Sequence, residues 1–174
     1  SQVIEAARVL QHQGRNDILI VLAGQGRQRS WLEEQSRHYG LRNVRFLDPL
    51  SKAEVADLVS AADVCLTIFK AVPILATCSP NKLFDSLAAG KPVIVNTPGW
   101  LQHLVTEHQC GRYARAGDPA DLAAQIVYMC DHPEFTRQAG WNARLLAEQR
   151  FDRRRLASEV LAVLGSAVHQ ELCV

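Results

Sequence analysis

The sequence predicts an α/β protein built on a doubly wound, parallel β-sheet, with a C-terminal end that is helical only. Short runs rich in Val, Ile and Leu alternate with stretches of helical period over residues 3–113, as in parallel sheets with crossover helices. After Asp118-Pro119 the apolar residues keep a helical spacing only. The length of 174 residues, with 48% hydrophobic and 21% charged side chains, fits one globular domain spanning residues 1–174.

The elements follow one another at short spacing. Apolar residues at helical intervals predict a helix over residues 3–12. The continuous apolar run 18–23 predicts a strand that is buried on both faces, and Gly24-Gln25-Gly26 ends it. The other expected elements are a helix over 29–39, a strand over 44–47, a helix over 51–61, a strand over 64–69, a helix over 79–90, a strand over 92–95, a helix over 101–107, a strand over 111–113, and helices starting near 119, at 133 and at 152, the last ending near 167.

Capping signals mark two of these helix starts. Ser51 and Glu54 have the spacing of a capping box. Asp118 is a candidate N-cap, with Pro119 in the first turn. Parallel α/β sheets bind ligands at the carboxyl ends of their strands. The loops in which we expect a ligand therefore begin at Gly24, Leu47, Lys70 and Asn96.

Composition excludes several classes of protein. The 19 Lys and Arg residues against 18 Asp and Glu give a net charge of +1, which is unlike the basic surface of a nucleic-acid-binding protein. The longest apolar run, residues 18–23, is too short to span a bilayer. The five cysteines are scattered without a Cys-x-x-Cys pair, and the six histidines have no ligand spacing. We therefore expect free cysteines in a reducing compartment and no metal site.

The segment 79–92 is the most informative for function. Ser79 is a candidate N-cap with Pro80 in the first helical turn, while Gly90 and Pro92 end the helix. The expected buried face consists of Leu83, Phe84, Leu87 and Ala88. The expected opposite side carries Asn81, Lys82 and Asp85.

A helix start of this kind can bind a phosphorylated ligand. Its free amides and the Lys82 ammonium suit a diphosphate, and Asp85, one turn further, can accept hydrogen bonds from a ribose diol. The alternative is an ordinary helix start with a solvated pair between Lys82 and Asp85. The apolar loop 70–78 favours a ligand, because such a loop after a strand can form a pocket wall or a mobile lid.

The Gly24-Gln25-Gly26 loop lets a ligand approach the backbone closely. It falls short of a dinucleotide-binding fingerprint, because Arg29 stands at the position of the third glycine. Asp48 nevertheless lies at about the right distance for a ribose-binding acid. The interpretation of the chain as a module that binds an NAD-type dinucleotide therefore stays open at this point.

Three stretches in this order resemble the C-terminal, donor-binding half of GT-B glycosyltransferases, in particular the large retaining family four. They are residues 22–26 (LAGQG), residues 43–51 (NVRFLDPLS) with 61–64 (AADV), and residues 79–85 (SPNKLFD) with 88–94 (AAGKPVI). Residues 117–119 (GDP) also match the end of the family pattern. The third stretch is similar to a subgroup that makes bacterial surface polysaccharides and lipopolysaccharide O-antigens. The resemblance implies a Rossmann-like domain, the C-terminal half of a GT-B fold.

The resemblance also implies a site for a nucleoside diphosphate sugar, most often a UDP-sugar. The acidic residue at Asp85 would hold the ribose hydroxyls, and the helix start would face the diphosphate. The backbone near Leu47 would lie beside the base, with the glycine loop lining the same cleft. The residues that it assigns to donor binding are Gly24, Gly26, Leu47, Ser79, Pro80, Asn81, Lys82, Leu83 and Asp85. It assigns no catalytic residue here, no cofactor and no metal, since basic groups and the helix dipole neutralise the phosphate charge.

Two positions depart from the family pattern. Asp85 stands where the family usually has a glutamate, which is one methylene longer. The first glutamate of the family falls on Thr77, and the Pro80-Asn81-Lys82 sequence of the subgroup is a candidate substitute for it.

The resemblance further implies that an N-terminal acceptor domain is absent from this sequence. The fragment would then bind the donor but be inactive alone. The whole enzyme would transfer a sugar, with retained configuration, to a glycan or lipid-linked acceptor in surface polysaccharide synthesis. We expect it in the cytoplasm, where it could associate peripherally with the inner membrane.

Competing interpretations belong to different classes. Half of a UDP-sugar 2-epimerase has a similar two-domain fold, and only product analysis of the whole protein separates it from a transferase. A dinucleotide-binding module would be stabilised by NAD and not by UDP. A pure interaction domain would leave the phosphate-binding helix start without a role.

Overall fold

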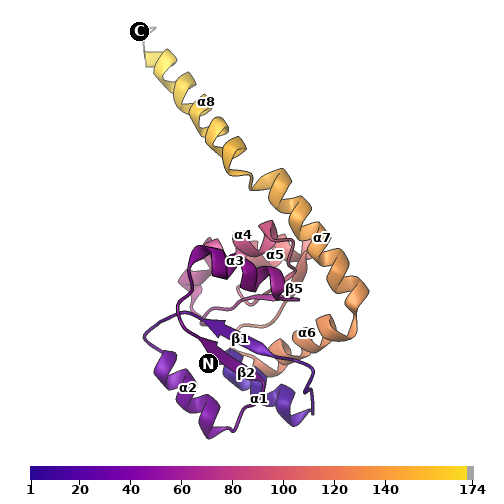
Figure 1. Cartoon of the computed structure of the whole chain (residues 1–174). Helices are drawn as coiled ribbons and strands as arrows, with labels where there is room; N and C mark the ends of the chain where they lie inside the picture. Colours follow the sequence, from indigo (N-terminus) through magenta and orange to yellow (C-terminus); the bar gives the residue numbers. More distant parts are fainter. Residues whose placement is uncertain (172–174) are drawn as a thin grey trace.

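A computed structural model describes residues 1–171 as a mixed α/β domain with parallel strands and a helical C-terminal end (Figure 1). The predicted fold class is confirmed. The elements in chain order are α1 (Gln2–His12), β1 (Ile20–Ala23), α2 (Arg29–His38), β2 (Val44–Leu47), α3 (Lys52–Ala61), β3 (Cys65–Thr67), the 3₁₀ helix η1 (Pro73–Thr77), α4 (Asn81–Ala88), β4 (Val93–Val95), α5 (Trp100–Glu107), β5 (Gly111–Tyr113), α6 (Pro119–Asp131), α7 (Pro133–Arg150) and α8 (Arg153–Glu171).

The strands form two parallel sheets instead of one hydrogen-bonded sheet. β1 pairs with β2, with Ile20 opposite Val44, and β4 lies between β3 and β5. Among the described residues, β1 has no partner on its other edge, and neither does β3. Both sheets nevertheless share one core, in which Ile20 and Ile94 pack with apolar residues of α1 and α6.

The prediction that residues 18–23 form a strand buried on both faces is wrong in two respects. The strand starts at Ile20, and Leu19 and Val21 are 55% and 36% exposed. Successive side chains of a strand point to opposite faces, and only the face that carries Ile20 packs against α1. A continuous apolar run therefore does not ensure that both faces are covered.

A second core lies under α4, α5 and α7. Leu83 and Leu87 of α4 are fully buried against β4 and α7, together with Leu101 of α5. α4 and α7 pack closely, because a Cβ built at Gly140 of α7 would lie 2.6 Å from the Gly90 carbonyl oxygen. This packing fixes α4, the helix whose start carries the predicted site.

Both capping predictions are confirmed. The Ser51 Oγ accepts a hydrogen bond from the Glu54 amide (3.3 Å), and the Ser51 amide donates to the Glu54 carboxylate (2.8 Å). This capping box lowers the pKa of Glu54. The Asp118 carboxylate accepts a hydrogen bond from the Asp121 amide (2.9 Å) at the start of α6.

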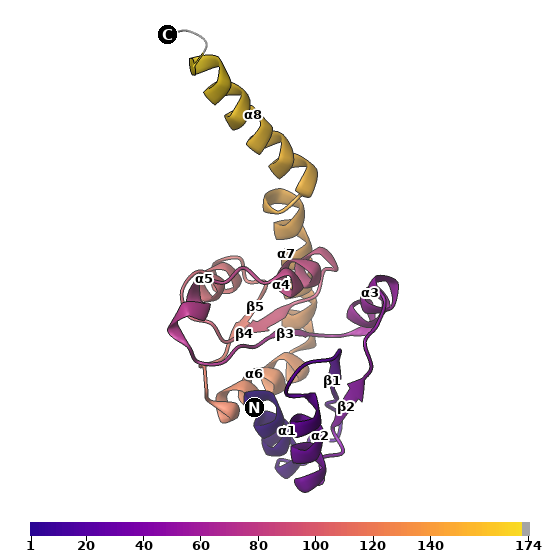
Figure 2. The ribbon, with the colours of Figure 1, turned by 90° about the vertical axis from the view of Figure 1, so that its left-hand side faces the viewer.

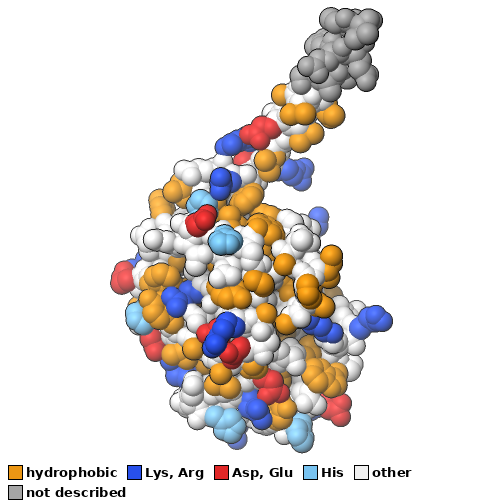
Figure 3. Space-filling view, turned by 180° about the vertical axis from the view of Figure 1, so that it is seen from behind, with side chains coloured by type: hydrophobic (Ala, Val, Ile, Leu, Met, Phe, Trp, Pro, Cys, Tyr) orange, Lys and Arg blue, Asp and Glu red, His pale blue; other side chains and the backbone are white. Residues whose placement is uncertain are grey.

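α8 continues beyond α7 and projects away from the body of the domain (Figures 1 and 2). Leu156, Val160, Leu161 and Leu164 on it are exposed, and apolar side chains line the projecting arm in Figure 3. None of the helices in the described part of the chain is long and apolar enough to cross a membrane.

Candidate functional site at the start of α4

The predicted site helix begins later than expected. Asn81 is its first residue and Pro80 is the N-cap, so the prediction that Ser79 caps the helix is wrong. Ser79 could be the N-cap only if Pro80 were the first helical residue, and Pro80 is extended (φ −82°, ψ 128°). Pro80 has no side-chain cap hydrogen bond. The Leu83 amide donates to the Pro80 carbonyl (3.0 Å), while within residues 1–171 the amides of Asn81 and Lys82 have no hydrogen-bond acceptor.

The two sides of α4 largely match the expectation. Asn81, Lys82 and Asp85 are exposed, and Leu83 and Leu87 are buried. Ser86 replaces the expected Ala88 on the buried face, because its hydroxyl donates to the Lys82 carbonyl (2.6 Å) and so needs no water.

The Lys82 ammonium lies over an aromatic ring instead of beside a carboxylate. Its Nζ is 4.7 Å from the centroid of the Phe69 ring. No acidic side chain in the described part of the chain forms an ion pair with it, so the alternative of a solvated Lys82–Asp85 pair is not what the structure contains. Although much of the residue is exposed, desolvation of the ammonium lowers its pKa.

Phe69 is held by a buried amide that the sequence did not indicate. The Asn96 Oδ1 accepts from the Phe69 amide and its Nδ2 donates to the Phe69 carbonyl, both at 2.8 Å. The same Nδ2 donates to the Gln2 Oε1 (2.8 Å), which also accepts from the Gly117 amide (3.1 Å). Asn96 thus connects the end of β3, the end of β4 and the start of α1.

The loop before α4 is more ordered than the expected irregular loop, since Pro73–Thr77 form the 3₁₀ helix η1. Trp100 holds the end of this loop by donating from Nε1 to the Cys78 carbonyl (3.2 Å). Its ring stacks on Phe84 of α4 with 6.5 Å between centroids. Val72 and Ile74 are exposed, so the loop presents apolar side chains to the surface.

The remaining predicted residues lie at the carboxyl ends of β1 and β2. Gly24 adopts a φ of +119°, which favours glycine, and a Cβ at Gly24 or Gly26 would meet nothing within 4 Å. The Gly24 amide donates to the Leu47 carbonyl (3.2 Å). Arg29 donates to both the Gly24 and the Leu47 carbonyl oxygens (2.7 and 2.9 Å) and pairs with Asp48.

The structure therefore places the predicted residues in two groups. One group surrounds the start of α4, and the other consists of the Gly24–Gly26 loop with Leu47. No hydrogen bond or ion pair between described residues joins the two groups directly. Among the described residues, no cluster of three or more His, Cys, Asp or Glu side chains could hold a metal ion.

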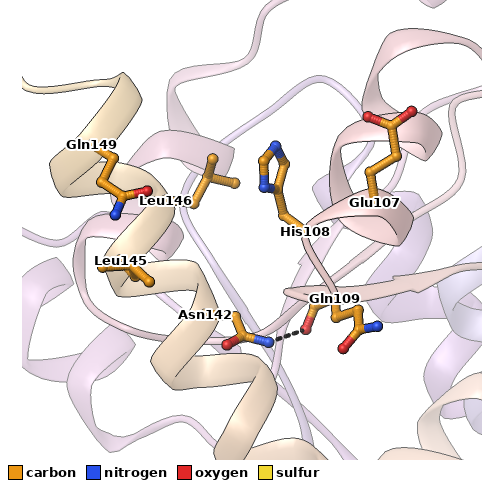
Figure 4. Close-up of a pocket in the computed structure, with 7 residues that line it drawn as sticks. All are labelled: Glu107, His108, Gln109, Asn142, Leu145, Leu146 and Gln149. Carbon is orange, nitrogen blue, oxygen red and sulfur yellow. Dashed lines mark hydrogen bonds between the residues drawn. The ribbon is translucent and has the colours of Figure 1, made fainter.

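A separate hollow lies between the end of α5 and α7 (Figure 4). The Asn142 Nδ2 donates to the Gln109 carbonyl there (3.1 Å), and His108 lies nearby. Because α5 leads into the amino end of β5, this hollow lies at the opposite end of the strands from the ligand-binding loops. None of the predicted donor-binding residues lines it.

Comparison with known proteins gives a family. The family model described as "Glycosyl transferases group 1" matches residues 2–132. A glycogen synthase of Mycobacterium tuberculosis is 28% identical over 153 residues, which is 87% of this chain and 36% of that protein. The chain thus spans about a third of the length of the curated relatives it matches first.

Solved structures show the same fold. Anabaena HepE, in complex with UDP-glucose, has a TM-score of 0.80 at 23% identity, over 95% of this chain and 44% of that one. WaaG, a glycosyltransferase involved in lipopolysaccharide biosynthesis, has a TM-score of 0.67 at 24% identity, over 86% of this chain and 39% of that one.

Proposed function

The chain belongs to the group 1 glycosyl transferases, as its motifs indicated, and from this membership we propose that it binds the nucleoside diphosphate sugar donor of such an enzyme at the start of α4. Lys82 carries the proposal. Its ammonium has no acidic partner in the described part of the chain, and in the same helical turn the amides of Asn81 and Lys82 have no acceptor among the described residues. Three donors at a helix start suit a diphosphate.

The other predicted residues would hold the rest of the nucleotide. Asp85 is exposed one turn further along α4 and has no side-chain hydrogen bond to a described residue, so its carboxylate is available to the ribose hydroxyls. Gly24, Gly26 and Leu47 would line the base end. Ser79, Pro80 and Leu83 would contribute the backbone around the diphosphate.

We propose a UDP-sugar as the donor and a glycan or lipid-linked acceptor. The similarity of the fold to HepE, described with UDP-glucose, supports the first part. The similarity to WaaG, described in lipopolysaccharide biosynthesis, supports the second. The sugar would be transferred with retained configuration, Lys82 and the helix amides neutralising diphosphate charge without a metal or other cofactor. An acceptor of this kind would place the enzyme in the cytoplasm, peripherally at the inner membrane.

We also propose that the whole enzyme has a further, acceptor-binding domain outside this chain. The curated relatives are longer, since the chain matches 36% of the first of them. The apolar side chains exposed on α8 would be buried against that domain. The edges of β1 and β3 that have no partner strand among residues 1–171 would each take a neighbouring strand from additional chain. Hydrogen exchange in the whole enzyme should then protect α8 amides that exchange freely in the 174-residue chain.

A lysine pair tests the donor site. Lys82→Met keeps most of the length of the side chain and removes its charge, and Lys52→Met does the same at the first position of α3, where Ser51 provides a cap. We expect Lys82→Met to weaken UDP binding about tenfold, as for the loss of a charge-assisted contact, and Lys52→Met to leave it unchanged. Equal effects of both variants would refute the assignment. Product analysis of the whole enzyme separates sugar transfer from 2-epimerisation.

A further inference from the structure

Arg29 connects the carboxyl ends of two neighbouring strands with a single guanidinium group. Its Nη1 donates to the Gly24 carbonyl at the end of β1 (2.7 Å) and to the Leu47 carbonyl at the end of β2 (2.9 Å). Its Nη2 pairs with Asp48 (2.9 Å), and its Nε pairs with Glu33 on α2 (2.8 Å). All three nitrogens of the fork are therefore engaged, a geometry that a lysine cannot reproduce.

These contacts hold the Gly24–Gly26 loop beside Leu47, and few other contacts fix this loop. Gly24 and Gly26 have no side chains, and the space beside both is open. Besides the β1–β2 ladder, two backbone bonds fix the loop, from the Gly24 amide to the Leu47 carbonyl (3.2 Å) and from the Arg29 amide to the Gly26 carbonyl (3.0 Å). Glycines give a loop conformational freedom, so an added clamp has a large effect on its order.

The environment of Arg29 suits this role better than that of an ordinary surface ion pair. Its side chain is 22% exposed, whereas that of Asp48 is 90% exposed. The hydrogen bond to Glu33 and the charge of Asp48 raise the pKa of Arg29, so the guanidinium stays charged. Exposed pairs contribute little by themselves. The bonds to two backbone carbonyls are what distinguish this residue.

We propose that Arg29 is a positioning residue for the base end of a nucleoside diphosphate. It orders the Gly24–Gly26 and Leu47–Pro49 backbone against which the base lies, and its pair with Asp48 holds the guanidinium in place. The inference rests on the proposed donor site, because it deepens the role of one half of that site.

The test compares Arg29→Gln and Arg29→Lys with Arg37→Gln, an exposed arginine eight residues further along the same helix α2. UDP is titrated calorimetrically into each 174-residue variant at a temperature where urea unfolding shows that the variant is folded. We expect Arg29→Gln to weaken UDP binding about tenfold, Arg29→Lys to restore only part of it, and Arg37→Gln to change it less than about twofold. Backbone ¹⁵N relaxation should report lower order parameters at Gly24–Gly26 in Arg29→Gln.

The outcomes separate the two claims. If the unsubstituted chain binds neither UDP nor GDP, the proposed donor site is wrong and the role of Arg29 there falls with it. If the unsubstituted chain binds UDP and both folded Arg29 variants bind UDP as tightly as it does, the donor site stands and the inference about Arg29 is overturned. A purely structural Arg29 would lower the unfolding free energy without changing the affinity of the folded protein, which also overturns it. Should Arg29→Gln not fold, the UDP affinity of Arg29→Lys and its ¹⁵N order parameters at Gly24–Gly26, each compared with the unsubstituted chain, decide.

Discussion

The Lys82 ammonium lies 4.7 Å from the centre of the Phe69 ring, so the first turn of α4 contacts the residue two positions beyond β3. A ring face attracts a cation without neutralising it. The contact therefore orients the ammonium at the helix start and leaves its charge available to an anion.

UDP binding should weaken at alkaline pH because of Lys82. Desolvation lowers the pKa of this ammonium below 10.5 in the folded, unliganded chain. As the pH rises through that lowered pKa, Lys82 loses its proton and its attraction for the diphosphate, so the affinity should fall at a lower pH than an ordinary lysine would cause. Calorimetric titrations from pH 7 upward should show this fall, and Lys82→Met should lack it. The same decline in Lys82→Met would mean that another group titrates.

The stability should change in the opposite direction over the same range. A lysine whose pKa is lowered by folding binds fewer protons in the folded state than in the unfolded one. The desolvated ammonium lowers the stability of the folded chain by its full amount below the pKa of Lys82 in the folded state. This loss of stability disappears as the pH rises toward 10.5. The stability of the unsubstituted chain relative to Lys82→Met should therefore increase through this window, as urea unfolding at each pH can show. A decrease would mean that the ammonium is favoured by folding.

Asn96→Ala should destabilise the domain and disturb the site together. The substitution leaves the Phe69 amide and carbonyl without their partner, and an unsatisfied buried group costs about 1–3 kcal/mol. Urea unfolding should show a loss of about this size or more. The control Asn142→Ala removes two exposed bonds, one to the Gln109 carbonyl and one from Gln138 on the same helix, and should cost about 1 kcal/mol or less. Equal losses of stability in the two variants would contradict a larger contribution of Asn96 to the stability of the domain.

Two glycine-to-alanine substitutions should change stability in opposite directions. A Cβ at Gly140 would lie 2.6 Å from the Gly90 carbonyl oxygen, so α7 and α4 must separate, at a cost of about 1–3 kcal/mol. Gly165 on α8 has open space around it, and alanine there should stabilise that helix by up to about 1 kcal/mol. Thermal unfolding measures the first and the helical circular dichroism signal the second. A neutral Gly140→Ala would contradict the close packing of α4 on α7.

Removal of α8 should leave the domain folded. A chain that ends at Asp152 loses the exposed Leu156, Val160, Leu161 and Leu164 but none of the residues of the two cores. We expect its urea midpoint to stay within an equivalent of about 1 kcal/mol, because surface residues away from special contacts contribute little. A large loss of stability would mean that α8 folds back onto the domain in solution.

Much of the fold was predictable because its signals are local. The capping box at Ser51 and the N-cap at Asp118 depend on a few neighbouring residues, and both helices start where predicted. The start of α4 was predicted wrongly by the same kind of reasoning, because Pro80, which was expected in the first turn, is extended and itself takes the N-cap position. The division into two sheets depends on which strand edges meet in space, which no local pattern reports.

The candidate site was predictable only in part. The spacing of Gly24 and Gly26 predicted the loop after β1, and the helical spacing of Asn81, Lys82 and Asp85 predicted that these side chains are exposed on α4. Asn96 and Arg29 act through contacts with residues 27 and 18 positions away, to Phe69 and Leu47, and such contacts appear only in the folded chain. The sequence offered one signal for Arg29, since it occupies the position at which a dinucleotide-binding loop has its third glycine.

Calorimetric titration of UDP into the 174-residue chain and into two aspartate variants tests whether the start of α4 is the donor site. Asp85→Ala removes the proposed ribose acceptor, while Asp57→Ala removes an exposed aspartate on α3 as a matched control. We predict weak UDP binding by the unsubstituted chain and by Asp57→Ala, and a loss of about tenfold or more in Asp85→Ala. Absence of binding to both UDP and GDP, or equal affinity of the two variants, would contradict the assignment of this helix start as the donor site.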